Sequence, residues 1–142
     1  SAIIGNKFSS LANIKWTEHL FSILGKTVIL EKEDMIDVVT AISGSGPAYI
    51  FNFAEIIITV CKDLGLSEEI SKKIFLQTIV GAGLLAIDSD KSPSKLREDV
   101  TSPNGTTQAA LNILMDKKNG WHEIIKNAVV AAYNRSKSLA KN

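Results

Sequence analysis

The chain has little of several residues that mark specialised proteins. It has a single cysteine, so no disulfide can form within one chain. Cys61 follows an apolar run, where a buried thiol is a more common role than a nucleophile. The chain also has no large excess of positive or negative charge, because its 16 lysines and arginines are balanced by 15 aspartates and glutamates. We therefore expect a reducing, cytoplasmic compartment and neither nucleic acid nor an anionic membrane as partner.

Long hydrophobic runs are missing as well. The longest apolar stretch, from Ala48 to Cys61, contains Asn52 and Glu55 and is shorter than the roughly 20 residues that a bilayer-spanning helix needs. We expect no transmembrane helix. The beginning has no signal-peptide pattern, and the absence of an initiator methionine leads us to expect a fragment or processed product of a longer chain.

Familiar catalytic and ligand-binding patterns are not found in the sequence. His19 and His122 have no second ligand at metal spacing, so we expect no metal site, and no Ser-His-Asp set is visible. The segment 44–46, with two glycines after an apolar run, is similar to the glycine loop of a dinucleotide-binding fold. We reject that interpretation because Tyr49 stands at the third glycine position and Pro47 interrupts the loop.

The spacing of apolar residues predicts about five to seven helices and little strand, hence an all-α helical bundle with one core. Start and stop signals support the assignment: Ser67 and Ser92 as N-terminal caps, Pro93 at a first helical position, and Gly25 and Gly65 at helix ends. The predicted helices span 11–24, 35–64 with a kink or break at 44–47, 67–87, 93–100, the segment between 107 and 119, and 121–141, with a short extended segment at 27–30.

Two of these helices, at 35–64 and 67–87, are too apolar for a lone globule of this size, in which each helix normally keeps a polar face. A homodimer that buries them is the simplest explanation. The alternative is a compact monomer with one fully central helix. The small residues at 81–83 would allow close helix packing.

The segment Val100–Thr107 is the main candidate site. Ser102 and the turn at 103–105 end the preceding helix, and Thr106 and Thr107 place two hydroxyls beside the first backbone N–H groups of the next helix. Such a helix start favours a carboxylate or phosphate by about 0.3–1 kcal/mol. The alternative is ordinary capping by a Ser, Thr or Asn side chain, which binds nothing but water.

Several separate motifs resemble those of pyrroline-5-carboxylate reductase, in the order in which that family has them. The resemblance covers nearly the whole chain from Asp34 onward and is closest to the C-terminal, helical, dimer-forming domain of the enzyme. Its motifs are Thr40-Ala41-Ile42-Ser43-Gly44-Ser45-Gly46-Pro47-Ala48-Tyr49-Ile50-Phe51, Gln77-Thr78 with Gly81-Ala82, Pro93 to Leu96, Asp99 to Thr107, and Ala131-Ala132 with Arg135-Ser136.

The resemblance implies reduction of the ring C=N of 1-pyrroline-5-carboxylate to L-proline, the last step of proline biosynthesis, with hydride from NADPH or NADH. The cofactor would be bound mainly by an N-terminal dinucleotide-binding domain preceding Ser1, which leaves residues 1–142 as the dimerisation and substrate-loop domain. The resemblance also implies an intertwined homodimer, assembled further into rings in many members. The chain alone is expected to be inactive.

The resemblance also assigns roles within the loop. Ser102 and Thr107 match the loop hydroxyls, and Gly105 and Thr106 match positions whose backbone N–H groups reach the substrate carboxylate. Thr107 would lie near the imine nitrogen and help to deliver a proton, as its catalytic role, although a bound water is the alternative donor. Asn104 stands where many relatives have glycine; asparagine tolerates a left-handed conformation, but its side chain could narrow the pocket.

Ser45 and Gly46 would lie near the nicotinamide and contribute orientation rather than chemistry. Two other interpretations stay open at this point. One is the helical C-terminal domain of another dehydrogenase that acts on a different small acid. The other is a stand-alone helical dimerisation module without a catalytic partner.

Overall fold

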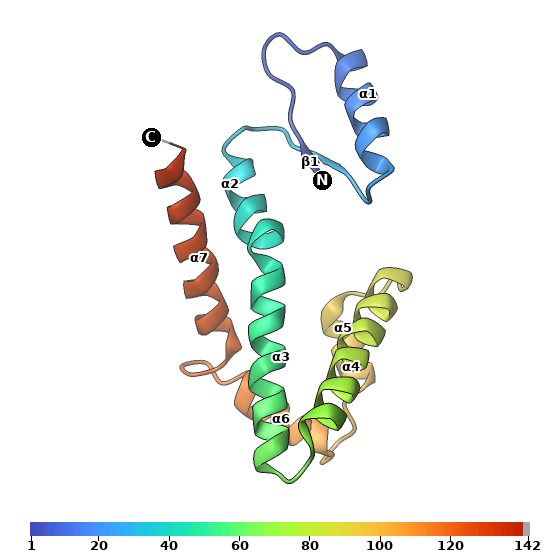
Figure 1. Ribbon diagram of the computed structural model, residues 1–142, viewed down its shortest axis with the longest axis vertical. Helices are drawn as coiled ribbons and strands as arrows, with labels where there is room; N and C mark the ends of the chain where they lie inside the picture. Colours follow the sequence, from blue (N-terminus) through green and yellow to red (C-terminus); the bar gives the residue numbers. More distant parts are fainter. Residues whose placement is uncertain (141–142) are drawn as a thin grey trace. The chain divides into compact units, whose positions relative to one another are not determined.

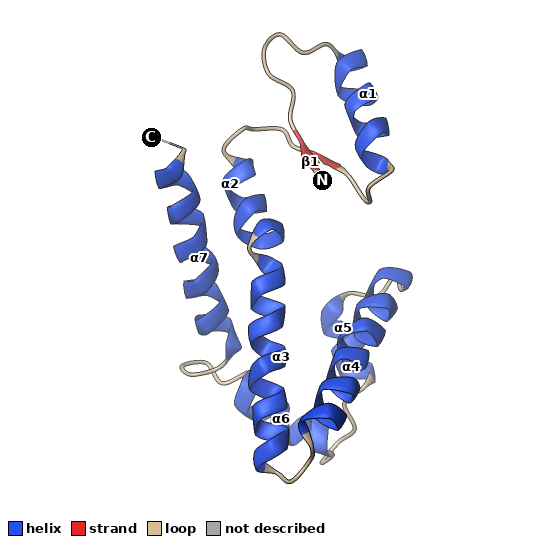
Figure 2. Ribbon diagram, viewed as in Figure 1, coloured by secondary structure: helices blue, strands red, loops and turns tan. Residues whose placement is uncertain are grey.

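A computed structural model describes residues 1–140 of the chain, and this part is almost entirely helical (Figure 2). The prediction of an all-α fold is confirmed. The elements in chain order are β1 (Ala2–Ile3), α1 (Leu11–Ser22), β2 (Val28–Ile29), α2 (Met35–Val39), the π-helical turn η1 (Thr40–Gly44), α3 (Gly46–Asp63), α4 (Glu68–Asp88), α5 (Pro93–Asp99), α6 (Thr106–Leu114) and α7 (Trp121–Leu139).

The chain divides into two compact units, which are described separately. The first contains residues 1–46 and the part of α7 from Ala128 onward, and the second contains residues 47–127. Within one chain the helices keep most of their apolar side chains on the surface. The expectation of one core stays a prediction for the chain together with its partner.

In the first unit, β1 and β2 form a parallel pair in which Ala2 lies opposite Val28 and Ile3 opposite Ile29. The prediction of a short extended segment at 27–30 is confirmed as β2; its pairing with β1 was not predicted. Helix α1 connects the two strands, as in other parallel crossovers. In the same unit, the Ser136 hydroxyl on α7 donates to the Asp37 carboxylate on α2 at 2.6 Å.

The helix from Met35 to Asp63 changes its winding where a kink or break was predicted. In η1 the Ser45 N–H donates to the Thr40 carbonyl at 2.9 Å, a bond between residues five apart instead of four. Pro47 has no N–H and cannot continue the ordinary ladder of α-helical bonds. The helix therefore continues into α3 after one wide turn. An irregularity just before Pro47 is confirmed as a change of helix type, and a break between two helices is not seen in this stretch.

In the second unit, α3 and α4 are joined by a short turn (Figure 1). The turn begins at Gly65, which has a φ of 97°, and the Ser67 hydroxyl caps α4 by accepting from the Ile70 N–H at 3.3 Å. The Phe53 ring then packs edge to face against two aromatic rings, Phe75 on α4 at 5.1 Å and Trp121 at the start of α7 at 4.9 Å. These contacts connect three helices of the unit.

Few apolar side chains are buried. Among the described residues, only Ala41 and Ala54 are buried hydrophobic residues. Large apolar side chains are exposed on every long helix, among them Phe51 on α3 (69%), Ile74 on α4 (56%) and Ile124 on α7 (57%). This exposure favours a partner-covered chain over the alternative of a compact monomer built around one central helix.

Two helical stretches, Met35–Asp63 and Glu68–Asp88, are long and apolar enough to cross a membrane by length and composition, with 6% of the apolar window buried in each. The expectation that no apolar segment has the required length is therefore wrong, because the helix extends beyond Ala48–Cys61 at both ends. Length and composition alone do not distinguish a membrane span from an apolar helix that other protein covers.

The turn before α7 requires glycine at position 120. Gly120 is buried, and a Cβ there would lie 2.6 Å from the Leu114 carbonyl oxygen and closer still to that of Asp116. We expect Gly120→Ala to lower the free energy of unfolding by about 2–4 kcal/mol in chemical denaturation. The control, Asn119→Ala, is exposed in the same turn and should change it by less than about 0.5 kcal/mol. Equal stabilities of the two variants would contradict the steric argument.

Candidate functional site

The candidate loop begins where α5 ends, and α5 is held at both ends. The Ser92 hydroxyl accepts from the Lys95 N–H at 3.3 Å, and Pro93 is the first helical residue, as predicted. At the other end the Thr101 hydroxyl donates to the Arg97 carbonyl at 2.6 Å, and the Thr101 N–H donates to the Glu98 carbonyl at 2.9 Å. The helix thus ends in a closed turn one residue before Ser102.

The loop itself is a tight turn. The Gly105 N–H donates to the Ser102 carbonyl at 3.0 Å. Asn104 has a φ of 58°, which is the only positive φ of a non-glycine residue in the described part of the chain. The prediction that asparagine adopts a left-handed conformation here is confirmed, because its short polar side chain tolerates that region better than most residues.

Helix α6 begins without a side-chain cap. Gly105 is the N-cap residue and Thr106 the first helical residue, and no side chain accepts a hydrogen bond from the helix start. The alternative of ordinary capping by a Ser, Thr or Asn side chain is thereby contradicted. Within residues 1–140, no protein acceptor is found for the backbone N–H groups of Thr106, Thr107 and Gln108.

The structure brings four of the six predicted site residues into this loop. Thr107 is half-buried, while Ser102 and Thr106 are exposed. The Gly105 N–H is already used by the turn, so an anion would meet the N–H groups of Thr106 and Thr107 first. The other two residues, Ser45 and Gly46, lie at the end of η1 in the unit of residues 1–46 and outside the loop.

A hollow of about 360 Å³ lies between α5 and α6, next to the loop. Its one cation is Arg97, which is half-buried and has no ion-pair partner among the described residues. This hollow was not predicted from the sequence, because its lining residues come from two helices that lie next to each other only in the folded chain. The walls are formed by Arg97, Glu98, Thr101, Gln108, Leu111, Asn112 and Met115.

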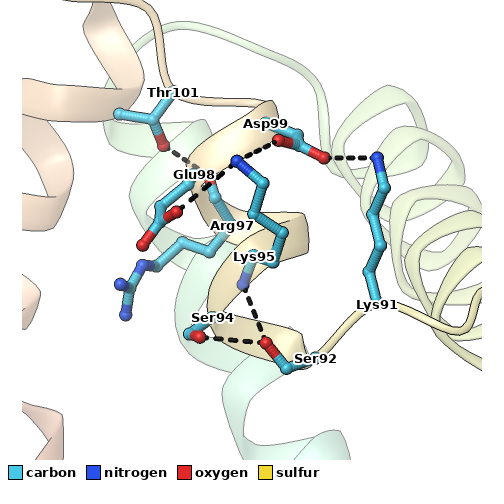
Figure 3. A network of polar contacts seen from close by, with 8 residues as sticks. All are labelled: Lys91, Ser92, Ser94, Lys95, Arg97, Glu98, Asp99 and Thr101. Carbon is cyan, nitrogen blue, oxygen red and sulfur yellow. Dashed lines mark hydrogen bonds and ion pairs between the residues drawn. The ribbon is translucent and has the colours of Figure 1, made fainter.

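Charged side chains around α5 form a network that the sequence reading also missed (Figure 3). The Asp99 carboxylate accepts from Lys91 at 2.6 Å and from Lys95 at 3.0 Å, and Lys95 also pairs with Glu98 at 3.7 Å. The bond from Lys91, and next the bond from Lys95, lower the pKa of Asp99 below 3.8. The Asp99 carboxylate in turn raises the pKa of Lys95 above 10.5.

The residues suited to a dinucleotide are few. Gly46 is half-buried, and a Cβ built on it would meet no atom within 4 Å, so its backbone is open to approach by a flat group such as a nicotinamide. Among residues 1–140, no strand is followed by a glycine loop and a helix of the dinucleotide-binding kind. The described residues therefore contain no main binding site of that kind. In the same range, no group of three or more His, Cys, Asp or Glu side chains could hold a metal ion.

Comparison with known proteins gives one consistent family. Residues 33–139 match the family model described as pyrroline-5-carboxylate reductase dimerisation. The chain is 40% identical over 141 residues to pyrroline-5-carboxylate reductase of Pseudomonas aeruginosa, covering 99% of the chain and 51% of that protein. It is 36% identical over 142 residues to pyrroline-5-carboxylate reductase 1 of Bacillus subtilis, covering 100% of the chain and 47% of that protein.

Solved structures agree with the sequence comparisons. A pyrroline-5-carboxylate reductase from Coxiella burnetii has a TM-score of 0.91 at 33% identity, covering 97% of this chain and 50% of that one. Plasmodium falciparum pyrroline carboxylate reductase with NADP bound has a TM-score of 0.82 at 36% identity, covering 96% of this chain and 52% of that one. The chain thus spans about half the length of the curated relatives it matches.

The Asp99 network can be tested by titration. Because the folded pKa lies below 3.8, the network stabilises the fold above about pH 4, and this contribution is lost as the pH falls through the folded pKa. We expect the carboxyl ¹³C signal of Asp99 to titrate with a midpoint below 3.8. Lys91→Met should move the midpoint upward, whereas Lys26→Met, in the other unit, should leave it in place. A midpoint that Lys91→Met does not move would show that the ion pair is not formed in solution.

Proposed function

Because the chain belongs to the pyrroline-5-carboxylate reductase dimerisation family, we propose that residues 1–142 are the C-terminal, dimer-forming domain of an enzyme that reduces 1-pyrroline-5-carboxylate to L-proline with NAD(P)H. The observation that carries the proposal is the family match over residues 33–139, which includes the uncapped start of α6. In this function the chain supplies the dimer interface and the loop that binds the substrate carboxylate, in the last step of proline biosynthesis.

The loop binds the substrate through its carboxylate. The N–H groups of Thr106 and Thr107 point out of a helix start that no side chain caps, and the helix dipole adds a partial positive charge there. The Ser102 hydroxyl donates a further hydrogen bond to the carboxylate. Gly105 keeps the turn tight, because a Cβ at this position would lie 3.1 Å from the Ser102 carbonyl oxygen. Its own N–H donates to the Ser102 carbonyl, so the N–H groups of Thr106 and Thr107 carry the binding of the carboxylate.

Reduction of the C=N bond needs a hydride on carbon and a proton on nitrogen. When bound, the nicotinamide supplies the hydride. Thr107 is half-buried at the second position of α6, in the first turn that supplies the carboxylate-binding N–H groups. We assign it the catalytic role of donating a hydrogen bond to the imine nitrogen and helping to deliver the proton; an unperturbed threonine hydroxyl is a weak acid, so a bound water is the alternative source.

The NADPH or NADH is bound mainly by an N-terminal dinucleotide-binding domain outside this chain. Ser45 and Gly46 contribute contacts to the nicotinamide side, through a backbone that no Cβ blocks at Gly46. Orientation of the reacting atoms is the main contribution of such groups. We therefore expect the isolated chain to lack hydride-transfer activity.

We also assign the exposed apolar helix faces to a second copy of the chain rather than to a membrane, in a cytoplasmic protein that assembles as a homodimer or a larger ring. On α4, Ile70, Ile74 and Leu84 share one face and are 49%, 56% and 55% exposed. Large apolar side chains that are half-exposed along one helix face are typical of a surface that a partner chain covers. The family model is one of dimerisation, which favours a copy of the chain as the occupant.

The dimer is tested by sedimentation of the chain without detergent. We expect a mass of twice 15.4 kDa and no association with neutral lipid vesicles. Ile74→Glu should weaken the dimer by at least tenfold in dissociation constant, because it places a charge in an apolar interface. Asn119→Glu adds the same charge to an exposed turn and serves as the control. A monomer that floats with vesicles would assign these faces to a membrane instead.

Activity is tested in the protein expressed from its complete coding sequence, by following NAD(P)H consumption with pyrroline-5-carboxylate. We expect Ser102→Ala to raise the KM for the substrate about ten- to hundredfold, as loss of a hydrogen bond to a charged group does. Thr107→Val should lower kcat as well. Thr17→Val makes the same change in α1, remote from the loop in sequence, and should have no effect.

The outcomes separate the function from the site. A folded, dimeric wild type without turnover would point to another small acid as substrate or to a dimerisation module without catalytic partner. An active wild type with unaffected Ser102→Ala and Thr107→Val variants would keep the function and discard these site residues.

A further inference from the structure

Asp99 connects α5 to the candidate loop, since it is the last residue of α5 and comes three residues before Ser102. Its carboxylate is held by lysines from two directions (Figure 3). Lys95 lies one turn earlier on the same helix, at 3.0 Å, whereas Lys91 precedes the helix cap and reaches Asp99 along the length of the helix, at 2.6 Å. The Lys91–Asp99 pair therefore connects the two ends of α5.

The stability of the helix by itself does not account for this carboxylate. A negative charge at the C-terminal end of a helix faces the negative end of the helix dipole, which is unfavourable. The two lysines offset that effect. A helix of 7 residues is also too short to be stable alone, so its geometry depends on such contacts at its ends.

We propose that Asp99, held by Lys91 and Lys95, is a positioning residue for the substrate loop. The inference rests on the proposed function, because it concerns the loop that binds the substrate carboxylate. Ordering of the last turn of α5 is transmitted along the backbone through Val100, whose N–H donates to the Leu96 carbonyl at 3.3 Å, to Ser102. The Ser102 carbonyl in turn accepts the Gly105 N–H that shapes the turn.

The charges around Asp99 could also act on KM by attracting the anionic substrate directly. A gain in this attraction and a loss of loop positioning change KM in opposite directions, so the two can be told apart. Removing the Asp99 carboxylate leaves Lys91 without its partner and Lys95 paired with Glu98 alone. By electrostatic attraction, the less neutralised lysines near an anion-binding loop would lower the KM for an anionic substrate. Loss of positioning would raise it. The direction of the change in KM therefore distinguishes positioning from attraction.

The test compares Asp99→Asn with Glu68→Gln in the protein expressed from its complete coding sequence. Glu68 pairs with Lys62 at 2.6 Å, the same separation as Lys91 and Asp99, but lies outside the loop region at the start of α4. We expect Asp99→Asn to raise the KM for pyrroline-5-carboxylate about two- to fivefold, the range for exposed ion pairs. The kcat and the KM for the coenzyme should change by less than twofold, and Glu68→Gln should change none of the three.

Salt and hydrogen exchange give two further measurements. The side chains of the pair are 56% and 32% exposed, so high salt should raise the KM of the wild type toward that of Asp99→Asn. Backbone amides at 100–108 should exchange faster in Asp99→Asn than in Glu68→Gln, and this measurement does not depend on turnover. An unchanged or lowered KM, or equal exchange in the two variants, would overturn the inference. A wild type without turnover would overturn the proposed function, while the exchange comparison would still decide whether Asp99 orders the loop.

Discussion

The fold depends on apolar helix surface that the chain does not bury within itself. Helices α3 and α4 are apolar over most of their circumference, yet their second unit is held together by few contacts, chiefly the packing of Phe53 between Phe75 and Trp121. Exposed apolar area on this scale costs free energy in water at about 25 cal/mol per Å². A partner chain that covers these faces would complete the core, so association and folding are expected to be coupled in this protein.

Within the second unit, backbone geometry rather than reactive side chains defines the candidate site. The turn at 102–105 closes α5 and opens α6, and it leaves N–H donors at the helix start without a protein acceptor. A side-chain cap at this position would occupy those donors and leave none for the proposed anion. Gly105 as N-cap keeps the donors available, while Asn104 accepts the left-handed conformation that the turn requires.

This arrangement suits a protein whose task is to hold a small acid rather than to carry out its chemistry. The described residues contain no perturbed catalytic acid in the loop, and the charged groups with shifted pKa near it, Asp99 and Lys95, lie on α5. Positioning of the substrate and a hydride donor from elsewhere account for the proposed reaction without a strong acid. The network on α5 then belongs to the same task, because it orders the residue from which the loop departs.

Most of the local structure could be predicted from the sequence. Caps at Ser67 and Ser92, an irregular turn before Pro47 and the left-handed turn at Asn104 were all predicted, because each depends on the chemistry of one or two residues. The residue types at 102–107 also predicted a turn followed by a helix start, and the binding of an anion there stays a prediction.

Features that depend on residues far apart in the chain emerged from the folded structure. It showed the division into two units, the parallel pairing of β1 with β2, the hollow beside Arg97 and the connection of Lys91 to Asp99. It also showed that the Gly105 N–H is occupied within the turn. The spacing of apolar residues shows that a helix face must be buried against something. It does not show which other helix or chain buries that face, because the hydrophobic effect is not directional.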